Sequence, residues 1–446
     1  MSNIRKDGPY SWFYLTATSI VSFTIVGLGD SIGIIVAVFI DHLNVSNAKG
    51  GWIGSIVFFL GRALSPIVVY IHRRVGFRWC MFISSVLYGF SLCVTPFMTN
   101  INIVFLTYSI PFGSSLSIVA TLSVITQREY FSKYFGFAVG VRYSANSIGA
   151  VVVSFILPIV LAALGYKMSF VSLLVFAPII LCYGFVARHH VHQDTESTER
   201  SGKSVINLYK EFLQDKSFTI SLVAIAMYFF TCYIPIVFMV RYGVTLGYPL
   251  SKAKWLLIVR GLTSFVIRLI AGRFGDFALK HGKVKMVMQI TFALFGVLNF
   301  MCSFLRAFPL LLVYMALIGI VEGVWWVTYS ILVMEITGGY YFDEAFSLIN
   351  LIGALSSLFG IPASGWIFDQ TDDFRYVFYT AFGMSLLAAL MLTISSHVRV
   401  DKELSLVEKS KRGKEEVPCE LIADRNNLIS ESDIESKTKL VYETTV

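Results

Sequence analysis

The chain alternates between long apolar stretches and short polar segments along most of its length. Because a helix rises about 1.5 Å per residue, roughly 20 apolar residues cross the ~30 Å hydrocarbon core of a bilayer. We predict transmembrane helices at residues 11–40, 51–71, 78–98, 101–126, 134–164 and 168–188 in the first half, and at 217–240, 255–273, 284–305, 308–337, 346–368 and 374–398 in the second. This pattern predicts an all-α integral membrane protein with twelve transmembrane helices in two six-helix bundles.

Polar segments mark the boundaries of these bundles. Residues 1–10 form a cytoplasmic N-terminus, 11–188 and 217–398 form the bundles, 189–216 link them, and 399–446 follow the last helix. The last segment mixes acidic and basic residues with little periodicity, so we predict a disordered cytoplasmic tail. Charged residues make up 14% of the chain, against about 25% in soluble domains. The composition therefore agrees with a membrane protein.

Lys and Arg residues are distributed unevenly between the two sides of the predicted bundles. Sixteen of the 36 lie in the N-terminus and the loops on its side, whereas seven lie in the loops on the other side. Because Lys and Arg are retained on the cytoplasmic side, we expect a multi-pass plasma-membrane protein with both termini cytoplasmic. This topology accounts for the net charge of +8 without nucleic acid as a partner. It places the sequon at Asn44 outside, which makes Asn44 a candidate glycosylation site.

The two halves carry similar turns after their second helices. The first half has His72-Arg73-Arg74-Val75-Gly76-Phe77-Arg78, and the second has Gly272-Arg273-Phe274-Gly275-Asp276. Together with two sets of six spans, these turns resemble those of the major facilitator superfamily. The resemblance implies a carrier built from two six-helix repeats with a binding site between them.

Further motifs resemble the monocarboxylate transporter family of that superfamily. The family opens its first helix with an acidic-Gly-x-aromatic-x-Trp signature, which is matched here by Asp7, Gly8, Tyr10 and Trp12. A second signature, at the fifth helix, is matched by Tyr130, Phe131, Lys133, Ala138, Gly140 and Gly149. The resemblance extends over residues 7–398. It implies a lipid bilayer, a small organic anion and a single-span accessory subunit as partners.

Six ionisable residues lie within the predicted spans: Asp30, Arg62, Arg142, Arg260, Arg268 and Glu322. Each costs about 2.5–3.5 kcal/mol at the centre of a helix on insertion scales, so partners or a water-filled cavity are expected. Four cations against two carboxylates leave an excess of positive charge, which attracts an anion. From helical depth we expect Asp30 to pair with Arg260 or Arg62, and Glu322 to lie beside Arg268 or Arg142. Internal pairing that only orders the bundle is the alternative for each residue.

The family resemblance bears directly on two of these positions. Arg268 stands where the family's eighth helix carries an arginine that binds the substrate carboxylate. Proton-coupled members have an aspartate where this chain has Ser264, and a lysine in the first helix where it has Asp30. The resemblance therefore implies carboxylate recognition by Arg268, whereas proton coupling stays an open question.

We therefore predict a secondary transporter that moves a small organic anion, most simply a monocarboxylate, by alternating access. The candidate substrate-binding residues are Arg268, Asp30, Arg62, Ser264, Glu322, Arg142 and Arg260. Two alternatives stay open: a carrier of an amino acid, a creatine-like zwitterion or an aromatic metabolite, and a non-transporting receptor or scaffold. The sequence contains no nucleotide loop, metal motif or nucleophile–base arrangement, so we predict no enzyme activity, cofactor or metal.

The chain ends in Glu443-Thr444-Thr445-Val446, which matches the C-terminal ligand that PDZ domains bind as an added edge strand. We expect a peptide of the last ten residues to bind PDZ domains through Thr444 and the carboxylate of Val446. Amidation of Val446 should abolish binding measured by fluorescence polarisation, because the backbone nest that holds the carboxylate loses its anion. Binding that survives amidation would rule out this mode.

Overall fold

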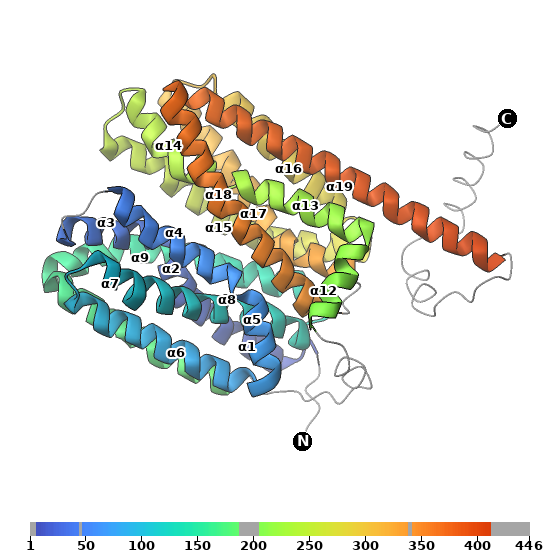
Figure 1. Ribbon diagram of the computed structural model, residues 1–446, viewed down its shortest axis with the longest axis horizontal. Coiled ribbons are helices and arrows are strands. Elements are labelled where there is room, and N and C mark those ends of the chain that lie inside the picture. Colours follow the sequence, from blue (N-terminus) through green and yellow to red (C-terminus); the bar gives the residue numbers. More distant parts are fainter. Residues whose placement is uncertain (1–5, 44–46, 187–204, 338–340, 412–446) are drawn as a thin grey trace.

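The computed structural model describes residues 6–43, 47–186, 205–337 and 341–411. Asn44, Thr444 and Val446 lie outside the described residues, so the predictions made for them are not tested by the structure. The described residues form two helical bundles that pack side by side, the first half from blue to teal and the second from green to red (Figure 1).

The first bundle is built from short helices joined end to end into longer spans. Its elements are α1 (Pro9–Val21), η1 (Ser22–Val26), α2 (Gly27–Asp30), α3 (Ile32–Leu43), α4 (Asn47–Ala63), α5 (Ser65–Val75), α6 (Phe77–Val94), η2 (Thr95–Phe97), α7 (Ile101–Val104), η3 (Phe105–Ser109), α8 (Ile110–Tyr130), α9 (Phe135–Ser172), η4 (Leu173–Phe176) and α10 (Ala177–Val186). Two of the joints, η1 and η3, are π-helical turns. At a third joint, between α4 and α5, Pro66 stands in the first turn of α5, where its missing amide is tolerated.

The second bundle has longer uninterrupted helices. Its elements are α12 (Val205–Gln214), α13 (Lys216–Thr231), α14 (Ile234–Thr245), α15 (Leu250–Lys280), α16 (Val284–Cys302), α17 (Phe308–Thr337), α18 (Phe342–Thr371) and α19 (Phe374–Lys411). Helix α12 lies in the predicted linker. The hydroxyl of its Tyr209 forms a hydrogen bond of 2.9 Å with the hydroxyl of Ser347 in α18. The linker therefore contacts the second bundle.

Ten of the described helices are long and apolar enough to cross a membrane, and α4 with α5, bent by 49°, supplies an eleventh. The helical run of residues 135–186 crosses the bundle and returns. It turns at Gly165, whose φ of 73° favours glycine. Both ends of the run lie beside the N-terminal segment, since the amide of Tyr134 donates to Asp7 and the carbonyl of Val186 accepts from Tyr10. The two arms of this run are the fifth and sixth predicted spans.

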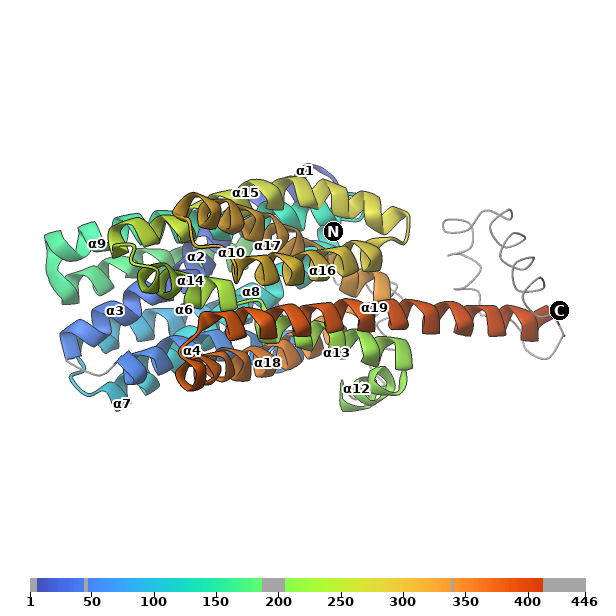
Figure 2. The ribbon, with the colours of Figure 1, turned by 90° about the horizontal axis from the view of Figure 1, so that it is seen from above.

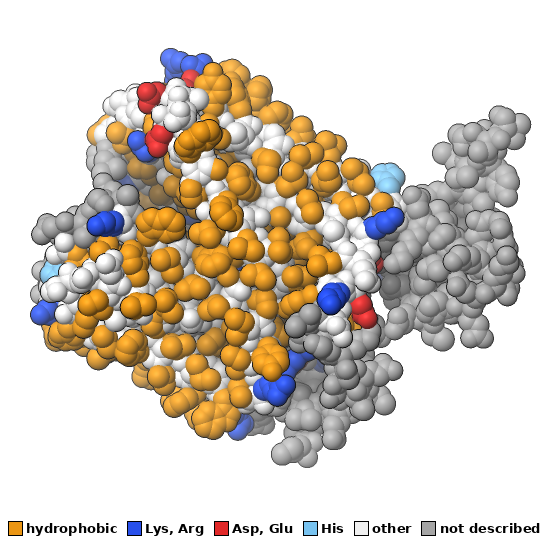
Figure 3. All heavy atoms as spheres, viewed as in Figure 1, with side chains coloured by type: hydrophobic (Ala, Val, Ile, Leu, Met, Phe, Trp, Pro, Cys, Tyr) orange, Lys and Arg blue, Asp and Glu red, His pale blue; other side chains and the backbone are white. Residues whose placement is uncertain are grey.

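Large apolar side chains cover the outer surface of the bundles. Phe185, Ile159 and Trp366 are each exposed by 65% or more. Figure 3 shows this apolar surface between charged groups at the two ends of the molecule. Such a surface is stable only in lipid, because soluble proteins rarely expose contiguous apolar patches of this extent. The chain is a multi-pass membrane protein.

Helix α19 extends beyond the end of the bundles as far as Lys411 (Figures 1 and 2). The disordered tail is predicted to start at residue 399, whereas the helix continues through residues 399–411. The continuation reflects composition, since residues 399–411 are rich in Lys, Glu and Leu and contain no Gly or Pro. The remainder of the predicted tail, residues 412–446, lies outside the described part of the chain.

The two bundles are in closest contact where α9 lies against α15. A Cβ atom at Gly140 would stand 2.5 Å from the carbonyl oxygen of Arg268 and 3.0 Å from Cα of Gly272. One turn earlier, a Cβ at Gly136 would stand 2.8 Å from the carbonyl oxygen of Gly272. Glycines on both helices therefore allow the two backbones to touch, as small residues do in membrane helix pairs.

Polar contacts reinforce this interface at the end of the molecule that carries the N-terminus. Asp276 of α15 accepts hydrogen bonds from the amides of Gly136 (2.5 Å) and Phe137 (2.9 Å), at the first turn of α9. A carboxylate satisfies the free amides of a helix N-terminus and is favoured by the helix dipole. Arg73 of α5 also forms an ion pair with Glu344 of α18. The halves are thus joined at this end.

The two family signatures meet in the folded chain. The carboxylate of Asp7 accepts from the amides of Ser132 (3.4 Å), Lys133 (3.1 Å) and Tyr134 (3.4 Å). The ring of Trp12 lies edge-on against that of Phe131, with centroids 5.4 Å apart. The first signature therefore caps the segment that leads into α9, which gives both motifs a structural role.

The glycine contact predicts a stability difference between two alanine variants. Gly140→Ala forces the backbones of α9 and α15 apart and should destabilise the protein by about 1–3 kcal/mol, as overpacking does. Gly89→Ala is the matched control, because a Cβ at Gly89 meets nothing within 4 Å. Its better helix propensity should leave stability unchanged or higher by about 0.5–1 kcal/mol. Thermal unfolding in detergent measures both, and equal midpoints would contradict the proposed packing.

Candidate functional site

A shared carboxylate forms the centre of the candidate site. Glu322 of α17 accepts from Nη1 of Arg260 through Oε2 and from Nη2 of Arg268 (3.2 Å) through Oε1. The two arginines stand eight residues apart on α15, which is about 12 Å along the helix, and Glu322 bridges them. One carboxylate thus faces two guanidinium groups, so this cluster keeps a net positive charge.

Glycines on α17 make this bridge geometrically feasible. Gly319 and Gly323 flank Glu322, and a Cβ at Gly319 would stand 2.0 Å from the Thr263 hydroxyl oxygen. A Cβ at Gly323 would stand 2.9 Å from the side chain of Ile267. Because both positions lack side chains, α17 lies close enough to α15 for Glu322 to reach both arginines.

Arg268 also connects the two bundles. Its Nη1 donates to the carbonyl oxygen of Tyr143 in α9 at 2.8 Å. Its Nε is buried and has no hydrogen-bond partner in the part of the chain that the structure describes, and the same holds for the hydroxyl of Ser264, one helical turn earlier on α15. The Nε–H group of Arg268 and the hydroxyl of Ser264 are therefore both available to a ligand.

Arg62 enters the site from the first bundle and is enclosed by aromatic rings of the second. Its guanidinium carbon lies 4.5 Å from the ring centroid of Trp326 and 5.5 Å from those of Phe229 and Tyr233. Its Nη1 also donates to the hydroxyl of Tyr233. Cation–π contacts stabilise the charge by about 0.5–2 kcal/mol each while leaving it unneutralised.

Asp30 ends α2, directly after the π-helical turn η1, and is exposed although Gly27, Leu28 and Gly29 before it are buried. It lies within electrostatic range of Arg268, Arg62, Arg260 and Glu322. Among the described residues it forms no ion pair. The expected pairing of Asp30 with Arg260 or Arg62 is therefore wrong, because Arg260 binds Glu322 and Arg62 binds Tyr233.

Arg268 and Arg142 are the two arginines expected beside Glu322. Arg268 forms an ion pair with Glu322, whereas Arg142 does not. The Arg142 side chain is buried, with its guanidinium carbon 4.1 Å from the ring centroid of Tyr143. Sequence reasoning missed the aromatic residues Tyr143, Phe229 and Tyr233, although they contact the intramembrane arginines. No sequence signal separates them from the many other aromatic residues of the spans.

The site has the chemistry of an anion receptor. Its guanidinium groups come from both bundles, at Arg62, Arg260 and Arg268, while Glu322 neutralises only one positive charge. The exposed carboxylate of Asp30 adds an acceptor for a cationic group. Within the described ranges, no three His, Cys, Asp or Glu side chains converge as metal ligands. The arrangement can therefore bind an anionic group.

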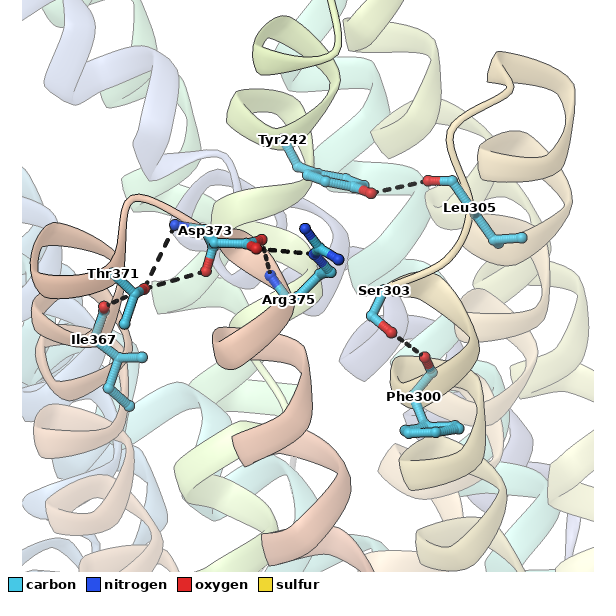
Figure 4. A network of polar contacts seen from close by, with 8 residues as sticks. All are labelled: Tyr242, Phe300, Ser303, Leu305, Ile367, Thr371, Asp373 and Arg375. Carbon is cyan, nitrogen blue, oxygen red and sulfur yellow. Dashed lines mark hydrogen bonds and ion pairs between the residues drawn. The ribbon is translucent and has the colours of Figure 1, made fainter.

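A separate pocket of about 280 Å³ opens at one end of the second bundle. Tyr242, Arg306, Phe368, Asp373 and Arg375 contribute to its lining. Figure 4 shows its polar contacts, among them the 2.8 Å ion pair between Asp373 and Arg375 and the 2.9 Å hydrogen bond from Tyr242 to the carbonyl of Leu305. The Asp373–Arg375 pair is solvent-exposed and lies outside the central charge cluster.

Comparisons with known proteins agree with this architecture. The family model described as Major Facilitator Superfamily matches residues 17–253 and 245–429. Monocarboxylate transporter 4 of Gallus gallus is 24% identical over 407 residues, covering 89% of this chain and 85% of that protein. Monocarboxylate transporter 10 of Homo sapiens is 20% identical, covering 96% and 85%. The predicted resemblance to monocarboxylate transporters is confirmed.

Solved structures show the same fold. The transporter FucP in the outward conformation has a TM-score of 0.68 and 13% identity, covering 86% of this chain and 99% of that one. The human organic anion transporter MFSD10 has a TM-score of 0.65 and 15% identity, covering 86% and 100%. The predicted fold class is confirmed.

The shared carboxylate predicts a large difference between two charge-removing variants. Glu322→Gln leaves Arg260 and Arg268 unpaired, and breaking a buried pair destabilises a protein by up to about 3–5 kcal/mol. Asp373→Asn is the control, because its pair with Arg375 is exposed and worth about 0–1 kcal/mol. The double variant Glu322→Gln/Arg260→Gln should recover part of the loss. Equal thermal unfolding midpoints for the two single variants would contradict a central role for Glu322.

Proposed function

Because the chain belongs to the Major Facilitator Superfamily, we propose that it is a secondary transporter that moves a small organic anion, most simply a monocarboxylate, across the plasma membrane by alternating access. The observation that carries this proposal is the excess of guanidinium groups over carboxylates between the bundles. A site with this charge stabilises an anion relative to a neutral or cationic solute. The relatives named monocarboxylate transporters support the same substrate class.

Arg268 is the proposed carboxylate ligand. Its unpartnered Nε supplies a first hydrogen bond, and Nη2 supplies a second when it exchanges Glu322 for the substrate. Two parallel N–H···O bonds from a guanidinium hold a carboxylate in a fixed orientation. Ser264, one turn away, offers a hydroxyl to the substrate. Glu322 then remains bound to Arg260 while the substrate pairs with Arg268, so each of the two arginines has a negatively charged partner.

The bundles provide a means of alternating access. With both termini cytoplasmic, the contacts of Asp276 and Glu344 hold the two bundles together on the cytoplasmic side. Rocking of one bundle against the other would break these contacts together with the bond from Arg268 to Tyr143. Because Arg268 also contacts the other bundle, a substrate bound there affects the contact between the bundles. Substrate binding is thereby coupled to the rocking motion that exposes the site to the opposite face of the membrane.

The second candidate substrate is an amino acid, a creatine-like zwitterion or an aromatic metabolite. The observation that favours it is Asp30, which is exposed and carries no ion pair among the described residues. A zwitterion would place its carboxylate at Arg268 and its amine at Asp30, with a ring beside Trp326 or Phe229. A receptor or scaffold function gains no support from relatives that are transporters.

Three further assignments belong to the proposal. Residues 1–10 and 399–446 lie in the cytoplasm, the C-terminus binds a PDZ domain, and a single-span accessory subunit accompanies the carrier. These assignments rest on the distribution of Lys and Arg, on the last four residues and on the family resemblance. Ser264 replaces the family's acidic residue and Asp30 replaces its lysine, so the proton cycle of the proton-coupled members is not carried over to this chain.

The substrate proposal is tested by uptake in oocytes of radiolabelled carboxylates and zwitterions at two pH values. Arg268→Lys keeps the charge but loses the bidentate fork, so uptake of the best substrate should fall by about tenfold or more. Arg78→Lys, at an exposed cytoplasmic turn, is the control and should transport normally. Surface biotinylation checks that expression is equal. Near-normal uptake by Arg268→Lys would contradict carboxylate binding at this residue.

A further inference from the structure

Arg142 is a buried cation with no counter-charge among the described residues. Its side chain is 1% exposed, and its Nε and Nη1 have no hydrogen-bond partner. In the described part of the chain no carboxylate stands within ion-pair distance of it. The other intramembrane arginines differ, because Arg260 and Arg268 bind Glu322 and Arg62 binds Tyr233. A buried charge left in this way is strongly unfavourable unless a ligand satisfies it during function.

Arg142 is next to the interface between the bundles but separate from the Arg268 site. Its guanidinium stacks on Tyr143, whose carbonyl oxygen accepts from Arg268 at 2.8 Å. The Tyr143 ring lies 6.0 Å from that of Trp326, which in turn lies beneath Arg62. Two neighbouring rings, with an arginine against each, therefore connect Arg142 in the first bundle to Arg62 in the central site.

The surroundings of Arg142 contain other polar atoms without partners. Asn146 follows one helical turn later on the same face of α9, and its Oδ1 is buried and unpartnered. This face packs against η1, since a Cβ at Gly149 would stand 2.1 Å from the carbonyl oxygen of Phe23. The hydroxyl of Ser22, in the same π-helical turn, is also buried without a partner. Such turns occur frequently at functional sites.

We propose that Arg142 forms a second anion-binding site, which receives the substrate carboxylate when the bundles separate at the end that carries the N-terminus. The inference rests on the proposed carrier function. In this structure the glycines hold α9 against α15, and Arg268 donates to the carbonyl oxygen of Tyr143. Separation of the bundles breaks the hydrogen bond between Arg268 and Tyr143. A substrate bound at Arg268 can then reach Arg142, the residue before Tyr143. The carboxylate then exchanges one guanidinium for another and leaves toward the cytoplasm.

Binding is tested with purified full-length protein in detergent, with sodium formate as the probe and sodium fluoride at equal concentration as the reference. The Arg268→Gln background removes the central carboxylate ligand. We expect formate still to raise the unfolding midpoint in this background, because a ligand that binds the folded state stabilises it. Adding Arg142→Met should abolish the effect, whereas adding Arg78→Met should not. A formate effect that is absent from Arg268→Gln, or that persists in Arg268→Gln/Arg142→Met, would overturn the proposal.

Transport from each side separates this role from a structural one. In proteoliposomes of known orientation, Arg142→Met should raise the half-saturation concentration on the cytoplasmic side by about tenfold or more, the value of one charge-assisted hydrogen bond. The half-saturation concentration on the outer side should stay near that of the wild type. Equal changes on both sides would contradict a side-specific site. If wild-type protein transports none of the carboxylates, the proposed function fails, whereas the formate result still decides whether Arg142 binds an anion.

Discussion

The contact between α9 and α15 is the constraint on which the site depends. Glycines at 136, 140 and 272 allow the two backbones to approach within van der Waals distance. This approach brings the guanidinium of Arg268 to the carbonyl of Tyr143 and the carboxylate of Asp276 to the first amides of α9. Larger side chains at these glycines would separate the bundles and the groups that they contribute.

Charge pairing within the bilayer is uneven, and this unevenness gives the site its chemistry. Glu322 binds two arginines and Arg62 is held by aromatic rings. Within the described ranges, Arg142 has neither a carboxylate beside it nor a hydrogen-bond partner for its Nε and Nη1. A fully paired set of charges would stabilise the bundle and leave little attraction for a substrate. The residual positive charge is therefore the property that favours an anion, and the exposed Asp30 is the group that admits a zwitterion.

The two family signatures show how a motif can be informative about a family without forming its binding site. Asp7 and Trp12 contact residues 131–134, at the turn that leads into α9. Gly140 and Gly149 lie where α9 touches α15 and η1, respectively. These residues fix the position of α9, which carries Arg142 and Tyr143. The signature residues therefore influence the site indirectly, because they fix the position of α9.

The sequence by itself determined the membrane spans, the division into two halves and the identity of the ionisable residues inside the bilayer. These are local properties, because the free energy of transferring a helix into lipid is a sum over its own residues. The pairing of those residues was decided by the tertiary structure. Depth along a helix suggested Asp30 as the partner of Arg260, but the partner is Glu322. That outcome depends on how far α15 and α17 rotate and approach, which Gly319 and Gly323 set through contacts between distant segments. The aromatic enclosure of Arg62 and the burial of Arg142 likewise arise only when the two bundles meet.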